Sequence, residues 1–505
     1  MIKLYKPAYL YFFVDIVLLL LTFFVVLDWF PLTTHTPFNK YSWPSFYYSL
    51  VWIVCSYILQ RYKPLRKQNF FASGLTLFYT TSFAFLIFWG LIYFFYKPYS
   101  GFVLLLFTVS VFVVNYVALT IYFAYRFAVD YNDITDEPTE ERRTAILKPA
   151  LDLDEESFKQ RCSIIVEHSS KCVLALLKSK IQLNSGNTWV YVQTEAENIE
   201  MTPNYQYSTI IQLERLNNMR GINSKLSIIN EKLADNGIFV CCFESKSTRK
   251  KRILSKYPPI LNYLVYTLDF LYKRIMPKVF FTRKLYYFIT GGRNRIFSKA
   301  EVLGRLYCFG FKVIREKKVG NLTYVFAQRI KQPESKRKRI YGPLIRLRRF
   351  GKNGVAFEVF KMRTMHPYSE YLQGYIYDRN SLKDGGKFNK DIRITTTGSI
   401  MRKYWLDELP MILNLLKGEM KLVGVRPLSA HYFSLYRKEL QKKRIHYKPG
   451  LLPPFYADMP KTIDDIQDSE LKYFRACEKN GSFVTDVKYL FLILKNILIK
   501  KARSG

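Results

Sequence analysis

Cysteine, histidine and acidic residues are scarce in this chain of 505 residues. The seven cysteines form no CxxC pair, and the five histidines lack the spacing of metal ligands. This argues against a disulfide framework or a structural zinc site, and is typical of a reducing compartment. The 40 acidic residues stand against 77 lysines and arginines, which leaves a net charge of +37. Such a charge predicts an anionic partner: lipid headgroups, a phosphorylated substrate or nucleic acid.

The N-terminal region lacks the small-residue cleavage site of a signal peptide. It contains long apolar runs instead, at residues 8–30, 43–60, 70–96 and 102–127. Each run approaches or exceeds the length that crosses a bilayer, so we expect a domain of four transmembrane helices over residues 1–130. Asp15 lies inside the first run, where a carboxylate is expected to face the interior of the bundle.

The loops between the apolar runs differ in charge. Loops 31–42 and 97–101 carry one lysine each, whereas the loop after the second run carries Arg61, Lys63, Arg66 and Lys67. By the positive-inside rule this loop is cytoplasmic, and both chain termini lie on the same side.

Residues 131–160 read as an acidic linker, and residues 161–333 as a middle domain. Its alternating pattern predicts an α/β sheet with strands at 188–193, 208–213 and 237–243, helices at 219–234 and 298–309, and a closing hairpin of strands at 311–317 and 321–328. This order resembles the second half of a class I methyltransferase fold. No glycine-rich loop follows an early strand, so we interpret the domain as a degenerate, non-catalytic Rossmann-like module.

Within that module, residues 257–290 are apolar and aromatic, with interspersed basic residues and three prolines. A proline-broken apolar helix with basic flanks is typical of interfacial or re-entrant membrane segments. A buried pair of domain helices is the alternative, and the sequence does not decide between them.

Residues 405–427 hold the adjacent acids Asp407 and Glu408 before an apolar run with helical spacing. Pro410 is tolerated in a first helical turn and Gly418 is a plausible stop, so we expect a helix that begins near Asp407. Its dipole would stabilise both ionised carboxylates, as a nucleophile or a magnesium ligand requires. The alternative is that the two acids only cap a helix.

Several basic residues surround these acids in the sequence. The stretch 355–365 has the composition of a strand and delivers Lys361 and Arg363 at its end. Arg393 and Arg426 also stand beside a turn or a strand end. Such side chains are suited to binding phosphate oxygens.

Seven short motifs in this region occur in the order found in one known family. They are Gly342-Pro343, Gly351-Lys-Asn-Gly354, Lys361-Met-Arg-Thr-Met365, Arg393-Ile-Thr, Leu406-Asp-Glu-Leu-Pro410, Lys417-Gly-Glu-Met and Leu422-Val-Gly-Val-Arg-Pro427. Together they resemble the bacterial sugar transferase family, the monotopic polyprenyl-phosphate phosphoglycosyl transferases that start exopolysaccharide, capsule and O-antigen assembly. The resemblance covers about residues 340–460. It implies a small α+β, helix-rich, membrane-associated catalytic domain, which we place at 334–505.

The resemblance implies a reaction and the residues that perform it. Asp407 would attack a UDP-sugar and form a phosphosugar-aspartyl intermediate with release of UMP, and undecaprenyl phosphate would then accept the sugar phosphate. Glu408 would help hold magnesium (Mg²⁺), with Asp407 beside it, or move a proton. Lys361, Arg363, Arg393 and Arg426 would neutralise the diphosphate. The expected location is the bacterial inner membrane, in contact with anionic lipids, with the catalytic domain in the cytoplasm; a homodimer is compatible with the sequence.

The family carries a re-entrant membrane helix directly before Gly342-Pro343, where this chain has the hydrophilic stretch 331–339. Residues 257–290 are the candidate substitute. At the C-terminus, alternating apolar and basic residues in 484–503 predict an amphipathic helix on the cytoplasmic leaflet, with a core helix as the alternative.

Two other functions compete with the transferase. A methyltransferase dependent on S-adenosylmethionine would need the glycine loop that is missing, and a non-enzymatic scaffold for polysaccharide assembly would not need the acid pair with its arginines. Nucleic acid is not expected as a partner, because the charge lies beside transmembrane runs and no nucleic-acid motif accompanies it. The sequence names neither the sugar nor the role of the middle domain.

Overall fold

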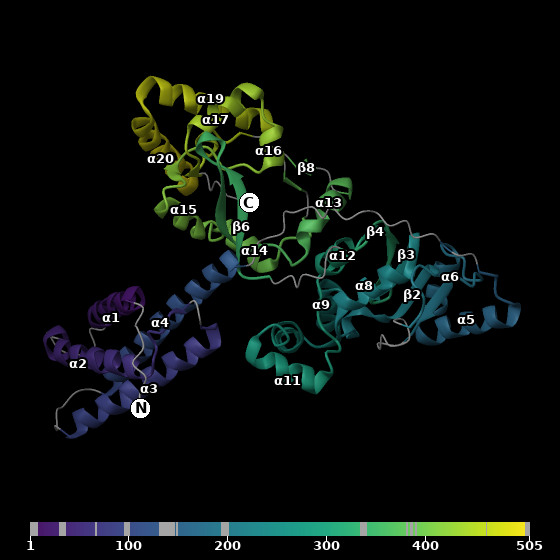
Figure 1. The fold of residues 1–505 in the computed structure, drawn as a ribbon, viewed down its shortest axis with the longest axis horizontal. Coiled ribbons are helices and arrows are strands. Elements are labelled where there is room, and N and C mark those ends of the chain that lie inside the picture. The colour runs from purple at the N-terminus through teal and green to yellow at the C-terminus, as the bar shows by residue number, and fades with distance from the viewer. Residues whose placement is uncertain are drawn as a thin grey trace. The chain divides into compact units, whose positions relative to one another are not determined.

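The computed structural model describes residues 9–29, 37–65, 68–94, 101–130, 147, 150–192, 201–333, 341–379, 382–383, 387–388, 391–460 and 462–499 (Figure 1). It divides into two compact units, Met1–Asn132 with Gly342–Arg346, and Asp133–Tyr341 with Leu347–Gly505. Most of the acidic linker, and the basic run at 334–340, lie outside the described residues.

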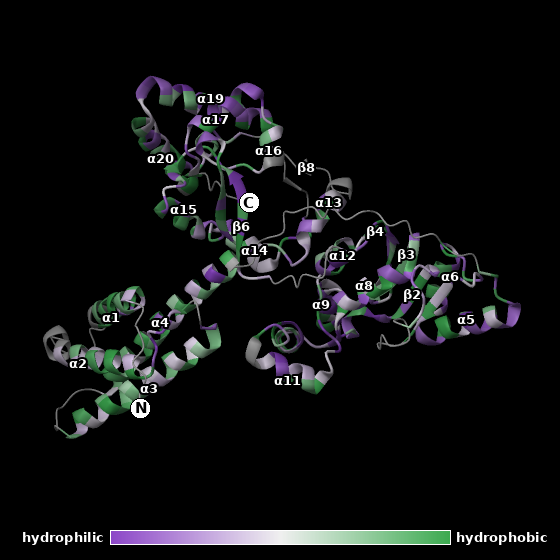
Figure 2. Ribbon diagram, viewed as in Figure 1, coloured by the Kyte–Doolittle hydropathy of each residue, from purple (hydrophilic) through white to green (hydrophobic). Residues whose placement is uncertain are grey.

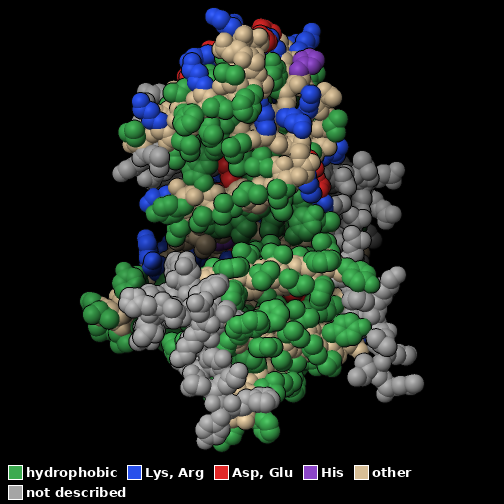
Figure 3. Space-filling view, turned by 90° about the vertical axis from the view of Figure 1, so that its left-hand side faces the viewer, with side chains coloured by type: hydrophobic (Ala, Val, Ile, Leu, Met, Phe, Trp, Pro, Cys, Tyr) green, Lys and Arg blue, Asp and Glu red, His purple; other side chains and the backbone are tan. Residues whose placement is uncertain are grey.

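The first unit contains the helices α1 (Tyr9–Trp29), α2 (Pro37–Ile58), α3 (Phe70–Phe94) and α4 (Gly101–Asp130). Within the described part of the chain, α1, α3 and α4 are long and apolar enough to cross a membrane, which indicates membrane association. The helix predicted at 43–60 is present as α2, with Pro44 inside it, but does not reach that threshold. The ribbon of these helices is mostly hydrophobic in Figure 2, and Figure 3 shows apolar side chains gathered on the face that it displays.

A buried ion pair joins two of these helices. Arg61, just beyond the end of α2, donates from Nε to Asp15 Oδ2 of α1 at 2.9 Å and from Nη2 to Asn115 Oδ1 of α4 at 3.1 Å. Asp15 is fully buried, which confirms that it faces the interior of the bundle. Arg61 is 2% exposed, so this positive charge belongs to the interior and not to the loop surface.

The second unit begins with a five-stranded sheet in the order β1-β2-β3-β5-β4. The strands β1 (Thr188–Tyr191), β2 (Tyr207–Arg215) and β3 (Leu233–Phe243) are parallel. The strands β4 (Phe311–Val319) and β5 (Leu322–Arg329) form an antiparallel hairpin, and β5 pairs with β3. The predicted strands and the closing hairpin are therefore confirmed.

Helices cover both faces of this sheet, because successive strand residues point to opposite sides. Ile210 and Phe239 pack in a cluster with α8 (Ile222–Lys232) and α12 (Lys299–Cys308). Their neighbours Ile211 and Val240 pack with α5 (Glu155–His168) and α6 (Lys171–Lys178). The helix α8 ends two residues before the predicted 234, since the chain enters β3 at Leu233.

The rest of the unit is rich in short helices. The strands β6 (Leu344–Phe350) and β7 (Ala356–Met362) form one small sheet, and β10 (Lys421–Val423) and β11 (Gly450–Leu452) form a second, parallel one. The helices and strands of this unit also include α9 (Lys246–Lys256), α10 (Leu261–Phe270), α11 (Phe280–Thr290), α13 (Gln373–Arg379), β8 (Leu382–Lys383), β9 (Lys387–Phe388), α14 (Thr396–Lys403), α15 (Ile412–Leu416), α16 (Ala430–Ser434), α17 (Lys438–His446), α18 (Phe455–Asp458), α19 (Ile463–Asn480) and α20 (Ser482–Ile499).

The predicted C-terminal helix is present as α20, with one buried and one exposed side. Tyr489 and Ile493 are buried in a cluster with residues of α17 and α19. Its other side exposes large apolar side chains, including Phe483 at 81% and Phe491 at 69%. One face of α20 is therefore part of a core, and the other has no apolar cover within the described residues.

Candidate active site

Asp407 and Glu408 lie in a turn between α14 and a 3-10 helix (Leu409–Met411) that leads into α15. A helical segment does begin near Asp407, as expected: Glu408 occupies its N-cap position, but its first turn, Leu409–Met411, is a 3-10 helix. The carbonyl of Asp407 accepts a hydrogen bond from Met362 N at the end of β7 (2.9 Å), which joins the turn to the strand. With only five residues in α15, little helix dipole reaches the acids.

The two acids do not act as helix caps. Glu408 precedes the 3-10 helix, but its side chain makes no capping hydrogen bond. Both side chains are buried, each in a residue that is 7% exposed. Burying a carboxylate is unfavourable unless a partner compensates it, so the groups around each acid determine what it can do.

Glu408 is held by two basic residues from different elements. Lys361 of β7 donates from Nζ to Glu408 Oε1 at 2.8 Å. Arg426, which follows β10, places Nη2 at 3.9 Å from the same oxygen. Burial lowers the pKa of Lys361, with Arg426 acting in the same direction, while Glu408 opposes the shift. Glu408 thus fixes the position of Lys361 Nζ, and the positive charge of Arg426 contributes to lowering the pKa of this lysine.

Asp407 is different, because its Oδ1 is buried and makes no hydrogen bond. Burial raises the pKa of Asp407, and the neighbouring Glu408 raises it further. Lys361 and Arg402 lower it, so cations nearby favour the ionised form. A buried carboxylate oxygen without a donor is suited to bind a cation or to attack an electrophile.

Two further arginines lie close to these charged residues, and the sequence analysis gave neither of them a role in the site. Arg402, in the last turn of α14, donates from Nε to Thr364 Oγ1 (3.0 Å), and burial lowers its pKa. Arg349 of β6 has its pKa lowered to about 10 by burial and by Arg426. Arg402 lies only five residues before Asp407 in the sequence, and this proximity could have indicated a role in the site. Arg349 is one of many basic residues in its region, so its sequence position gave no such indication.

The remaining two predicted phosphate ligands have other described partners. Arg393 is 7% exposed and pairs with Asp391, with Nη2 at 2.7 Å from Oδ2. Arg363 lies over the ring of Tyr341, 5.0 Å from its centroid. The structure therefore brings Lys361, Arg426 and the two acids together, and adds Arg402, whereas the described contacts of Arg393 and Arg363 are with Asp391 and Tyr341.

Neighbouring buried polar residues hold this arrangement in place. Asn414 of α15 donates from Nδ2 to Glu358 O (2.7 Å) and accepts from Phe360 N (3.1 Å), which ties the helix after the acids to the strand that carries Lys361. Arg444 of α17 pairs with the fully buried Glu470 and donates to the carbonyl of Arg426. These hydrogen bonds thus fix the backbone near Lys361 and at Arg426, the two basic residues that contact Glu408.

The two carboxylates can be compared with the donors that magnesium requires. In the part of the chain that the structure describes, no three His, Cys, Asp or Glu side chains gather into a complete protein site. Magnesium commonly uses one or two carboxylates together with substrate phosphates. Asp407 supplies an unbonded Oδ1 and Glu408 lies beside it, so this donor set is adequate for an ion brought with a diphosphate.

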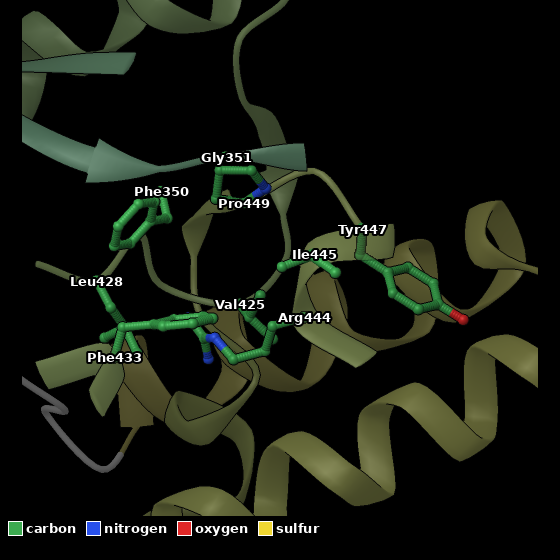
Figure 4. Close-up of a pocket in the computed structure, with 9 residues that line it drawn as sticks. All are labelled: Phe350, Gly351, Val425, Leu428, Phe433, Arg444, Ile445, Tyr447 and Pro449. Carbon is green, nitrogen blue, oxygen red and sulfur yellow. The ribbon is translucent and has the colours of Figure 1, made fainter. Parts of the chain in front are cut away.

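A small cleft lies close to the site but does not contain the acids. Figure 4 shows Phe350, Leu428, Phe433 and Arg444 among its lining residues. Arg444 is the residue that also holds the carbonyl of Arg426. The cleft therefore lies next to the backbone of Arg426, is lined mainly by apolar residues and does not include the two acids.

Comparison with known proteins places the similarity in this region. The family model for bacterial sugar transferases matches residues 334–500. An uncharacterized sugar transferase, EpsL of Bacillus subtilis, is 34% identical over 151 residues, which are 30% of this chain and 67% of EpsL. The galactosyl transferase CpsE of Streptococcus agalactiae is 32% identical over 155 residues, 30% of this chain and 33% of CpsE. The UDP-glucose:undecaprenyl-phosphate glucose-1-phosphate transferase of Xanthomonas campestris is 36% identical over 170 residues, 32% of each chain. The chain thus spans about a third of the length of CpsE and of the Xanthomonas protein.

Proposed function

Since the chain belongs to the bacterial sugar transferase family, we propose that it transfers a sugar 1-phosphate from a UDP-sugar to undecaprenyl phosphate. Relatives whose names state such a reaction, with glucose or galactose as the sugar, support the reaction class. The observation that carries the assignment is the buried Asp407 carboxylate, which has an unbonded oxygen and lies among Lys361, Arg402 and Glu408.

In the first step Asp407 Oδ1 attacks the β-phosphorus of the UDP-sugar. The bond between that phosphorus and the bridging oxygen breaks, UMP leaves with the electron pair, and the sugar phosphate stays on the carboxylate as an acyl phosphate. Lys361, Arg426 and Arg402 neutralise the diphosphate, and this matters because charge builds up on the leaving phosphate as the bond breaks. Arg349 adds positive charge to the same surface.

In the second step an oxygen of undecaprenyl phosphate attacks the same phosphorus. The Asp407 carboxylate leaves, and a polyprenyl-diphosphate sugar forms. Magnesium, when bound by Asp407 or Glu408 together with the diphosphate, supplies additional charge neutralisation. Glu408 keeps Lys361 pointing toward the phosphates and is placed to take or return a proton.

The membrane arrangement is part of the same proposal. All four N-terminal helices cross the inner membrane with both termini in the cytoplasm, and α20 places its exposed apolar face on the cytoplasmic leaflet. The five-stranded module is a degenerate, methyltransferase-like Rossmann domain without a cofactor. A buried network at the carboxyl end of β3, in which Arg249 bonds Asp269 and Glu244, supports this, because such strand ends are where a doubly wound sheet would bind its ligand.

The test follows a UDP-sugar labelled in its β-phosphate. With the full chain in membranes and the lipid acceptor omitted, we expect label on the protein and UMP in solution for at least one sugar. Adding undecaprenyl phosphate moves the label to lipid. Asp407→Asn should lose both signals by about 10³-fold or more, because the nucleophile is removed.

The matched control is Asp464→Asn, which changes an acid whose side chain is 78% exposed on α19. It should retain both signals. Full labelling of Asp407→Asn would show that the nucleophile is another group. S-adenosylmethionine binding with no UMP release for any sugar would favour the methyltransferase, and neither signal for any ligand would favour the scaffold.

A further inference from the structure

A helical lobe projects from the sheet module on the side of α11 (Figure 1). We define the α10–α11 lobe as residues 261–290: α10 (Leu261–Phe270), a turn of π-helix (Leu271–Ile275) and α11 (Phe280–Thr290). The sequence left open whether this segment is buried in the domain or lies in a membrane surface. Large side chains of the segment are exposed, so it is not wholly buried in the domain.

Large apolar side chains of the lobe are exposed at helical spacing. On α10 and the following turn the exposed positions recur every three or four residues, which places them on one face: Leu261, Leu264, Leu268, Leu271 and Ile275. On α11, Leu285, Phe288 and Ile289 recur in the same way, with Phe288 88% exposed. Among the residues that the structure describes, nothing covers these two apolar helix faces.

The other side of the lobe is firmly attached to the module. Asp269 of α10 is bonded by Arg249 of α9 at 2.6 and 2.9 Å. Arg274 pairs with the buried Glu301 and donates to Ile296 O at 2.7 Å. Tyr286 of α11 is fully buried and bonds Arg293 O at 2.9 Å. The lobe thus has its own polar and packed inner face, and the apolar stripes are a second face.

The charge of the lobe and its flanks is almost entirely of one sign. Residues 246–300 contain 14 lysines and arginines and one acid, Asp269. That acid is neutralised by Arg249 and by Lys273 at 2.7 Å. Lys256, Arg283 and Lys284 are exposed. Apolar stripes with exposed cations and no free acid are the features of a segment that binds an anionic lipid surface.

We propose that the α10–α11 lobe inserts its apolar stripes into a lipid leaflet that contains anionic headgroups. A second copy of this chain is a poor occupant, because each lobe would bring the same positive charge to the contact. A leaflet is always at hand, since the same chain carries three helices able to cross a membrane. The lobe thus attaches the five-stranded sheet module to the membrane directly, and this proposal does not depend on the reaction proposed for Asp407 and Glu408.

The experiment places an environment-sensitive fluorophore on the lobe of the full chain. In a background of Cys162→Ser and Cys172→Ser, which removes the thiols that are not buried, NBD is attached at Leu268→Cys or Phe288→Cys. The chain is reconstituted into vesicles of phosphatidylcholine with phosphatidylglycerol. We expect blue-shifted emission that is quenched by lipids carrying a nitroxide. The control, Gln160→Cys on exposed α5, should emit as in water and escape quenching.

A second variant tests the role of charge without touching the apolar stripes. Arg283→Gln with Lys284→Gln should weaken quenching at Leu268→Cys, and vesicles of phosphatidylcholine alone should do the same. Circular dichroism and thermal unfolding verify that each labelled chain is folded. Water-like emission at both lobe positions in folded protein would overturn the proposal. A blue shift without quenching by lipid, increasing with the number of chains per vesicle, would assign the face to a second copy instead.

Discussion

Asp407 and Glu408 are neighbours with equal burial, but only Glu408 is bonded to the lysine. The difference follows from the turn that carries them, which directs the Glu408 carboxylate to Lys361 and leaves Asp407 Oδ1 without a donor. The bonded acid is suited to orient a cation, and the unbonded one to react. We therefore expect the two acids to have different roles in the proposed reaction, although both are carboxylates.

Lys361 and Glu408 shift the pKa of Asp407 in opposite directions, and a variant of each residue tests its effect on the pH dependence of the reaction. Its raised pKa means that the carboxylate becomes protonated, and activity falls, at a higher pH than for an ordinary aspartate. Lys361→Met removes a charge that lowers this pKa, so the acidic limb should move to higher pH. Glu408→Gln removes a charge that raises it, so the limb should move down. Formation of the labelled intermediate against pH measures both.

The rate of intermediate formation will fall in both variants. The pH at which the rate declines on the acidic side is therefore the quantity to compare. Lys442→Gln, on the exposed side of α17, should leave it in place. Limbs that move in the same direction for Lys361→Met and Glu408→Gln would mean that the titrating group is not Asp407.

At the scale of elements, the site depends on how β7 and α15 are joined. Asn414 is fully buried and bonds Glu358 O, Phe360 N and Glu419 Oε2. Asn414→Ala leaves buried backbone groups unsatisfied, which should cost about 1–3 kcal/mol of unfolding free energy. Because β7 carries Lys361, transfer activity should fall as well. Thermal unfolding in detergent and the UMP assay measure the two effects.

Glu439→Gln serves as the control, since this residue is exposed on α17. It should change neither quantity. An Asn414→Ala protein with unchanged unfolding temperature would show that the strand and the helix are held together by other contacts.

The sequence predicted the strands of the sheet and the approximate start of the site helix, but not the 3-10 first turn of that helix or its link to β7. Strands β2 and β3 alternate side chains between two apolar layers, and such alternation is a local signal. The bond from Met362 N to Asp407 O joins residues far apart in the chain, and no periodicity reports it. Likewise the acid pair was visible as a motif, whereas Arg349 required the fold to bring it toward Arg426.

At the scale of the whole molecule, the sheet module and the site region share a core. Leu372 is fully buried, and with Tyr375 and Ile376 it belongs to the same cluster as β3, α8 and α12. The hydroxyl of Tyr375 bonds Glu316 of β4, and a methyl group at Gly304 of α12 would collide with the carbonyl oxygen of Tyr368. The segment that follows Lys361 and Arg363 is thus built into the module.

Leu372→Ala should therefore weaken both parts at once. The cavity is expected to cost about 2–5 kcal/mol, whereas Leu372→Met, which conserves volume, should cost much less. Hydrogen exchange in the full chain should increase in β3 and α12 and also in α14, which follows the shared segment. Increased exchange in β3 and α12 alone would show that the two parts unfold independently.

The pair of Asp15 and Arg61 has a consequence for how the N-terminal helices enter a bilayer. An isolated charge at the centre of a spanning helix costs about 2.5–3.5 kcal/mol at insertion. Arg61 neutralises the Asp15 carboxylate from a position 46 residues later in the chain, so we expect α1 to be stable in lipid only together with the segment that carries this arginine.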